Sequence, residues 1–72
     1  MGYEGEIILE LSEKDIGKNI TYIDVFKGCE TGKIKSFNND LKIAYVVFKC
    51  NNDWNNFKNY TAEACNYNSL AF

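Results

Sequence analysis

Residues 42–50 alternate between two faces with a period of two, and this run constrains the fold more than any other. One face of the extended run would carry Ala44, Val46, Phe48 and Cys50, and the other face Tyr45, Val47 and Lys49. Such alternation is typical of a β-strand that packs one face against a core. The same period recurs elsewhere in the chain, so the sequence predicts a mostly β protein.

Four further extended runs are predicted on the same grounds. They cover residues 6–11, 18–26, 30–37 and 60–65. In the second of these runs, Ile20 and Tyr22 fall on one face, whereas Ile23 and Val25 fall on the other. Asn38-Asn39-Asp40 supplies a turn, because Asn and Asp tolerate the left-handed conformation. Five short strands with no helical block predict an all-β fold, a small five-stranded barrel.

Helical structure is expected only as single turns. Ser12 and Asp15 have the spacing of N-cap and N3 residues, with Gly17 closing the segment, although a plain turn fits residues 12–17 equally well. Residues 66–70 predict one 3₁₀ turn that brings Leu70 onto the end of the barrel. With 72 residues, the chain forms one domain with a thin core, which self-association into a homo-oligomer would extend.

The charge balance and the missing residue types exclude several kinds of protein. The net charge of −2 excludes a general polyanion binder, which needs clustered Lys and Arg, and argues against nucleic acid as the ligand. The chain has no histidine, no Gly-rich phosphate loop and no carboxylate pair in an evident cleft, so we expect no enzyme. It also has no proline, so the edges of its sheet need protection by charge, bulges or a second subunit.

The three cysteines are interpreted as buried structural thiols. Cys29, Cys50 and Cys65 form no CxxC pair, and zinc would lack ligands without histidine, so no disulfide framework, metal or cofactor is expected. No stretch approaches the roughly 20 apolar residues of a membrane helix, and residues 7–9 are too short for the apolar part of a signal peptide. We therefore expect a cytoplasmic protein that does not enter a membrane.

Residues 17–70 carry a series of short motifs in a fixed order. The motifs are Ile20-Thr21-Tyr22-Ile23, Cys29-Glu30-Thr31-Gly32, Ser36-Phe37-Asn38-Asn39, Tyr45-Val46-Val47-Phe48, Ala64-Cys65 and Ser69-Leu70. In the order and spacing of these motifs, about three-quarters of the chain resembles a family of small proteins common in bacteriophages and prophages. The resemblance implies an SH3-like barrel of the kind seen in KOW and Tudor modules, a phage or prophage origin, and no established activity.

The chain departs from the family pattern in three places. The position of Val47 is often Arg in the family, the segment before Cys29 is shorter than usual, and the loop over residues 51–59 is longer and more aromatic. These differences replace a cation with apolar and acidic surface. They therefore weaken a function in nucleic-acid binding that KOW-type relatives would otherwise imply.

The first candidate site is the loop over residues 51–60. Trp54, Phe57 and Tyr60 would form a stacking platform beside Asp53 and several amides, suited to a nucleobase, a peptide or an anchor residue of a partner protein. The alternative is that Trp54 or Phe57 folds back to extend an undersized core.

The second candidate is the outward face of residues 42–50. Tyr45 and Val47 would expose an apolar patch there, and such patches mark interfaces. Alternatively, an N-terminal strand with Ile7 and Leu9, or a second subunit, covers that face.

A third candidate is an acidic arm near the N-terminus, which would either dock on a basic surface or form an ordinary solvated face. It contains Glu4, Glu6, Glu10, Glu13 and Asp15.

These observations predict a binding protein encoded by a phage or another mobile element. The leading hypothesis is an inhibitor of a bacterial defence system, of the anti-CRISPR kind, that occludes a surface of a host protein. A second hypothesis is an oligomer that sequesters a nucleotide signal, with Trp54 or Tyr60 stacking on the base and Lys33, Lys35 or Lys58 meeting phosphate. A third is a KOW-like module that contacts nucleic acid, which the net charge disfavours.

Overall fold

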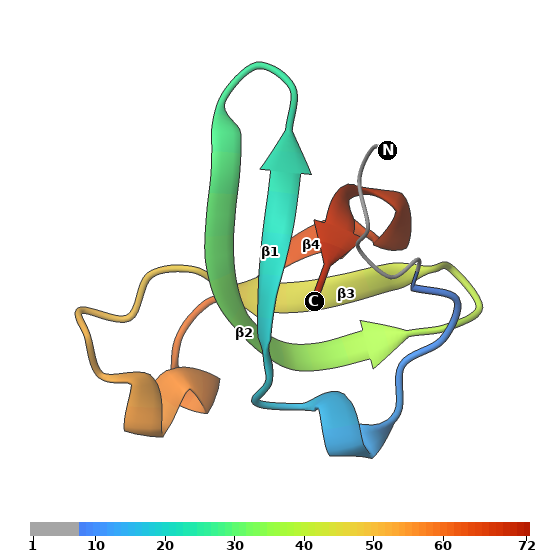
Figure 1. Ribbon diagram of the computed structural model, residues 1–72. Coiled ribbons are helices and arrows are strands. Elements are labelled where there is room, and N and C mark those ends of the chain that lie inside the picture. Colours follow the sequence, from blue (N-terminus) through green and yellow to red (C-terminus); the bar gives the residue numbers. More distant parts are fainter. Residues whose placement is uncertain (1–7) are drawn as a thin grey trace.

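A computed structural model describes residues 8–72, which form five β-strands and three short 3₁₀ turns. The strands are β1 (Asn19–Asp24), β2 (Gly28–Asn38), β3 (Ile43–Val47), β4 (Glu63–Asn66) and β5 (Leu70–Ala71). The turns are η1 (Glu13–Asp15), η2 (Trp54–Asn59) and η3 (Tyr67–Ser69). Neighbouring strands run antiparallel in the order β4-β3-β2-β1-β5 (Figure 1). The predicted all-β class is confirmed.

The sheet is open, which corrects the prediction of a closed barrel. β4 and β5 are its two edges, and within the described residues β4 pairs with β3 while β5 pairs with β1. The identity of the fifth strand also differs from the prediction. Residues 8–11 form no strand, residues 6 and 7 lie outside the described part of the chain, and Leu70–Ala71 supplies the fifth strand instead.

Asn39 accounts for residues 8–11 lying outside the sheet. Its side-chain oxygen accepts a hydrogen bond from the Leu11 N–H at 2.9 Å, and its amide nitrogen donates to the Leu11 carbonyl at 2.9 Å. The Tyr67 hydroxyl donates to the same Asn39 oxygen at 2.7 Å. With the backbone of Leu11 satisfied by a side chain, the segment needs no strand partner, and Ile8 and Leu11 pack into the core.

β2 is the long central strand, and it bends so that its two halves pair with different partners (Figure 1). Residues 28–33 pair with β1 and residues 33–38 with β3. A β-bulge shifts the register between Ile34 and Ser36, and bulges of this kind bend a strand. Gly32, which precedes this bulge, allows a close approach of β2 to β3, because a Cβ at this position would clash with the Val47 carbonyl oxygen and lie 2.8 Å from Val46 Cγ1.

The core is built from the faces that the alternation predicted. Ala44, Val46, Phe48 and Cys50 are all buried, and so is Ile20 on β1. Ile34 on β2 lies directly opposite Val46 and is buried with it. Each such side chain contributes roughly 1.5–3 kcal/mol when it leaves water. Leu70 is buried after the turn η3, as expected.

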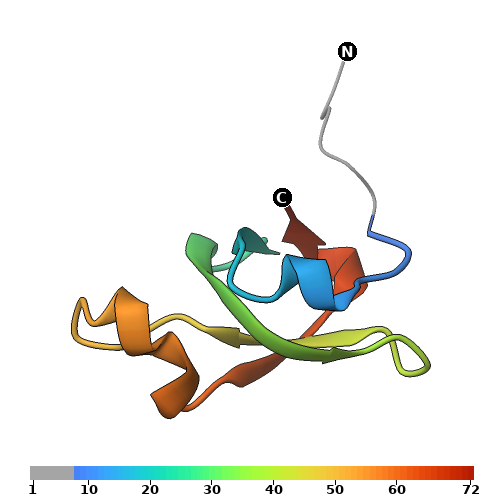
Figure 2. The same ribbon diagram turned by 90° about the horizontal axis from the view of Figure 1, so that it is seen from below.

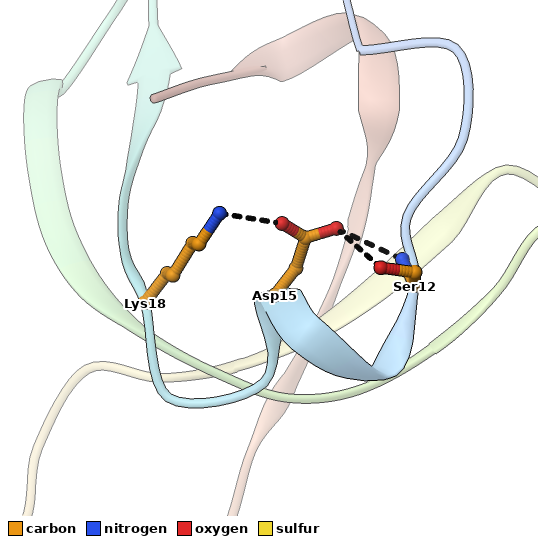
Figure 3. Close-up of polar contacts among 3 residues, drawn as sticks. All are labelled: Ser12, Asp15 and Lys18. Carbon is orange, nitrogen blue, oxygen red and sulfur yellow. Dashed lines mark hydrogen bonds and ion pairs between the residues drawn. The ribbon is translucent and has the colours of Figure 1, made fainter.

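Asp15 holds the turn that precedes β1. Its carboxylate accepts hydrogen bonds from the Ser12 N–H at 2.8 Å and from Ser12 Oγ at 3.5 Å, and it pairs with Lys18 Nζ at 3.0 Å (Figure 3). These contacts, the Ser12 N–H first among them, hold the pKa of Asp15 below its ordinary value. Of the two alternatives that the sequence left open for residues 12–17, the structure has the helical turn, with Ser12 as N-cap and Asp15 at N3. Gly17 then turns the chain with a φ of +90°.

Candidate functional site

The loop over residues 51–60 carries four of the predicted site residues, and Asp53 ties it together. The Asp53 carboxylate accepts hydrogen bonds from Tyr60 Oη at 3.1 Å and from Asn56 Nδ2 at 3.0 Å. The bond to Asp53 favours the protonated phenol and raises the pKa of Tyr60. Lys35 Nζ donates to the Tyr60 carbonyl at 2.8 Å, which fastens the end of the loop to β2. The polar groups of this segment therefore form hydrogen bonds within the loop or to β2. Figure 2 shows the loop to one side of the sheet.

The aromatic rings of this loop are half-buried. Trp54, Phe57 and Tyr60 all have intermediate exposure. Phe57 lies against the backbone of Gly17, where an added Cβ would be 3.6 Å from Phe57 Cζ. Phe57 thus lies beside the entry to β1, although it is outside the main core cluster. Trp54 borders a shallow hollow of about 340 Å³, together with Asn19, Thr31, Gly32 and Lys33.

The outward face of β3 is not the exposed apolar patch that the alternation predicted. Val47 is buried, at 0% exposure, and Tyr45 is half-buried. The expectation for Val47 is wrong because the folded chain closes around it: Lys33 of β2 lies beside Val47 in the sheet, and Gly32 approaches its carbonyl oxygen closely. Leu9 is 71% exposed, so it is not packed over this face, and Ile7 lies outside the described residues.

The acidic residues near the N-terminus do not share one role. Asp15 is engaged with Ser12 and Lys18, whereas Glu10 and Glu13 are exposed. Glu4 and Glu6 lie outside the described residues. The described members of this set therefore combine a structural carboxylate with a solvated face.

The most exposed large apolar side chains of residues 8–72 lie at the turn between β1 and β2. Val25 is 88% exposed and Phe26 94%. Asp24 Oδ1 accepts hydrogen bonds from the Phe26 N–H at 2.7 Å and the Lys27 N–H at 3.1 Å, which keeps the pKa of Asp24 low. Gly28 closes the turn with a φ of +91°. The backbone is thus fixed while both apolar side chains stand in solvent at the end of a projecting hairpin (Figure 1).

The sequence predicted a bend at residues 27–29, about two residues beyond the observed turn, because it extended the preceding strand through Val25 and Phe26. A signal was present. The apolar pair stands between Asp24 and Gly28, two residue types that favour turns, and Asp accepts hydrogen bonds from the backbone two residues on. An apolar pair enclosed by turn residues has no core to face.

A groove of about 470 Å³ lies beside the hairpin turn, a volume typical of ligand sites. Tyr22 and Phe48 provide its aromatic lining, with ring centroids 6.3 Å apart and planes at 66°. Charged residues from three strands and the turn also line it; they are Asp24, Glu30 and Glu63, with Lys27 as the cation. The groove is therefore aromatic and acidic.

Two thiols line the same groove and differ in environment. Cys65 is 5% exposed, and burial, followed by the charges of Glu63 and Glu30, raises its pKa to about 11. Cys65 therefore stays protonated at neutral pH. Cys29 is exposed, which corrects the expectation that it is buried; Cys50 is buried as predicted.

Two wider properties of residues 8–72 bear on the kind of site. No three His, Cys, Asp or Glu side chains in this range are grouped so as to hold a metal ion. The helical turns of the same range are too short and polar for any of them to cross a membrane. The comparisons with known proteins add no relative, since no protein-family model, no curated protein and no solved structure matches the chain.

Proposed function

We propose that the protein is a non-enzymatic binding protein that inserts the Val25-Phe26 turn into a pocket on a partner protein. The observation that carries this proposal is the almost complete exposure of both side chains on a turn whose backbone Asp24 fixes. A monomer gains nothing by holding an aromatic ring in water, and exposed apolar groups mark interaction sites. Aromatic anchors dominate the energetics of interfaces, and a fixed backbone loses little entropy on binding.

The class of partner follows from the sequence resemblance. The motifs of residues 17–70 resemble small proteins of phages and prophages, a family with no established activity, and we propose that this protein acts on the host. The proposed partner is therefore a component of a bacterial defence system in the host cytoplasm. Insertion of the hairpin turn would occlude a surface that the defence component needs.

A phage-challenge assay tests this function. Cells that each carry one of a panel of bacterial defence systems express the protein and are infected with phage. The wild-type protein is expected to restore plating against at least one system, and the double variant Val25→Ser, Phe26→Ser to lose at least about tenfold of that effect. Leu41→Ser is the matched control, because Leu41 is 62% exposed at a different turn.

Two outcomes would contradict the proposed function. In the first, no defence system is inhibited. In the second, the double variant inhibits as well as the wild type while circular dichroism and thermal unfolding show both to be folded.

One observation favours a second candidate function, the binding of a nucleotide. Trp54 and Lys33 line the same hollow, so an indole ring and an ammonium group are placed for a base and a phosphate. Lys33 Nζ donates to the Gly17 carbonyl at 3.1 Å and keeps further donors free for a phosphate. Equilibrium dialysis against linear and cyclic nucleotides tests it. Retention that Trp54→Ala abolishes is expected; retention by Trp54→Ala, or none at all, would count against it.

A further inference from the structure

The groove beside the hairpin turn has an excess of negative charge. Three carboxylates and one ammonium line it, which leaves a formal charge of −2. Glu30 comes from β2 and Glu63 from β4, strands that are separated by β3 in the sheet. Both charges nevertheless act on the buried Cys65 thiol, since each raises its pKa. Glu30, Glu63 and Cys65 all line the groove, so carboxylates from two separate strands lie along the same groove.

The aromatic lining of the groove lies next to these carboxylates. Tyr22 is directly opposite Glu30 in the antiparallel register, so the ring and the carboxylate project from the same face. Phe48 packs edge-on against Tyr22. An aromatic ring beside a carboxylate attracts a flat cation through both its face and the neighbouring charge.

We infer that this groove binds the guanidinium group of an arginine side chain carried by the partner protein, next to the pocket that receives Phe26. The inference rests on the proposed function. A guanidinium is planar, donates in a fork that matches a carboxylate, and stacks on aromatic rings, whereas an ammonium acts as a compact point charge. The partner surface therefore combines an apolar pocket with a flanking arginine.

The composition of the chain separates this partner from a second copy of the protein. All eight basic residues of the sequence are lysines. A second copy therefore has no guanidinium to offer, and the cation nearest its own turn is Lys27. The response of the groove to arginine and to lysine thus distinguishes the two occupants.

Titration of the ¹⁵N-labelled protein with N-acetyl-arginine methylamide tests the inference. Saturable shifts are expected at the backbone amides of Tyr22, Glu30, Glu63 and Ala64, which line the groove. The citrulline analogue has the same shape without the charge and is expected to bind at least about fivefold more weakly. The lysine analogue is expected to bind more weakly than the arginine probe. Equal binding of the arginine and citrulline probes, or no saturable shift, would overturn the inference.

Charge variants show whether the carboxylates are responsible. The double variant Glu30→Gln, Glu63→Gln is expected to lower the affinity for the arginine probe at least about fivefold. Glu10→Gln, Glu13→Gln is the matched control: it removes the same amount of charge at exposed residues that do not line the groove. High salt provides a check without mutation, because it weakens pairs between exposed charges. Equal affinity in both double variants, or no effect of salt, contradicts the inference.

Phe26→Ser distinguishes the arginine site from the proposed function. Phe26 does not line the groove, so Phe26→Ser is expected to lose defence inhibition and to bind the arginine probe unchanged. Defence inhibition without probe binding would overturn the arginine site alone. Sedimentation supplies the remaining outcome, because a dimer that dissociates on Lys27→Ser would place a second copy in the groove and also overturn the inference.

Discussion

Two segments of this chain each combine a carboxylate with aromatic residues, and they use the carboxylate in opposite ways. In the loop over residues 51–60, Asp53 accepts hydrogen bonds from the side chains of Tyr60 and Asn56, and the rings are half-buried. In the β1–β2 turn, Asp24 accepts hydrogen bonds from backbone N–H groups, and the ring of Phe26 is free. The richer aromatic segment therefore stabilises the fold, and the poorer one presents a surface. In this chain, the aromatic side chain that is left exposed is the one whose neighbouring carboxylate binds backbone N–H groups rather than side chains.

The largest effect that separates the two segments is on global stability. Phe57→Ala is expected to lower the free energy of unfolding by about 1.5–3 kcal/mol, because Phe57 packs on the backbone of Gly17. Phe26→Ala is expected to change it by less than about 0.5 kcal/mol, because the ring already stands in water. Urea unfolding measures both. Equal losses in the two variants would break the comparison.

A smaller difference is expected between the two aspartates. Asp53→Ala is expected to lower the free energy of unfolding by about 1 kcal/mol, because it leaves the half-buried Tyr60 hydroxyl without its acceptor. Asp24→Ala is expected to act locally, raising hydrogen exchange at the Phe26 and Lys27 amides at least about fivefold. Exchange monitored by NMR, with Leu41 as an internal reference, distinguishes a local from a global effect. An increase at all amides in Asp24→Ala would contradict a local role.

Protonation of Asp24 at low pH tests whether its carboxylate stabilises the hairpin turn. The pKa of Asp24 is lowered from 3.8, first by the Phe26 N–H and then by the Lys27 N–H. The folded state thus favours the ionised carboxylate. Its contribution to stability is therefore present above pH 3.8 and is lost as the pH falls through the lower pKa of the folded state. The Phe26 amide resonance is expected to titrate below pH 3.8. A midpoint above that value would show that the carboxylate does not hold the turn.

Ionisation of Tyr60 at high pH tests the loop over residues 51–60 in the same way, and its effect on stability is expected to be the smallest. The pKa of Tyr60 is raised from 10.0, first by its bond to Asp53. The folded state thus favours the protonated phenol. Its contribution to stability is therefore present below pH 10.0 and is lost as the pH rises through the higher pKa of the folded state. The absorbance of tyrosinate, compared between the wild type and Tyr60→Phe, reports this ionisation. In Asp53→Asn the Tyr60 ionisation is expected to move to lower pH.

The features predicted correctly are those that adjacent residues decide. The alternation around Val46 selects the core face of β3, and the spacing of Ser12 and Asp15 offered the helical turn as one of two alternatives, which bonds within four residues then stabilise. The sequence also predicted the burial of Leu70 after a 3₁₀ turn. In each case the local preference and the folded structure agree, which is what a foldable sequence requires.

The features that were missed depend on contacts between distant residues. Val47 is buried in the folded chain, where Lys33 and Gly32 of β2 lie next to it, which no alternation of residues 42–50 reveals. Residues 8–11 stay out of the sheet because Asn39, far along the chain, satisfies the backbone of Leu11. Of the candidate site, the sequence pointed to the aromatic loop, whereas the groove joins β1, β2 and β4 and exists only after folding.

The short edges of the sheet limit how this molecule meets other chains. β5 has two residues, and β4 has four, with the charged Glu63 at its start. Edges so short, one of them charged, make poor templates for a strand from another chain, which guards the protein against aggregation. Strand addition at β4 or β5 would therefore offer a bound peptide few backbone hydrogen bonds. Under the proposed function, recognition therefore depends on side chains, and a change of partner in evolution would need only substitutions in the hairpin turn and the groove, with the backbone pairing left intact.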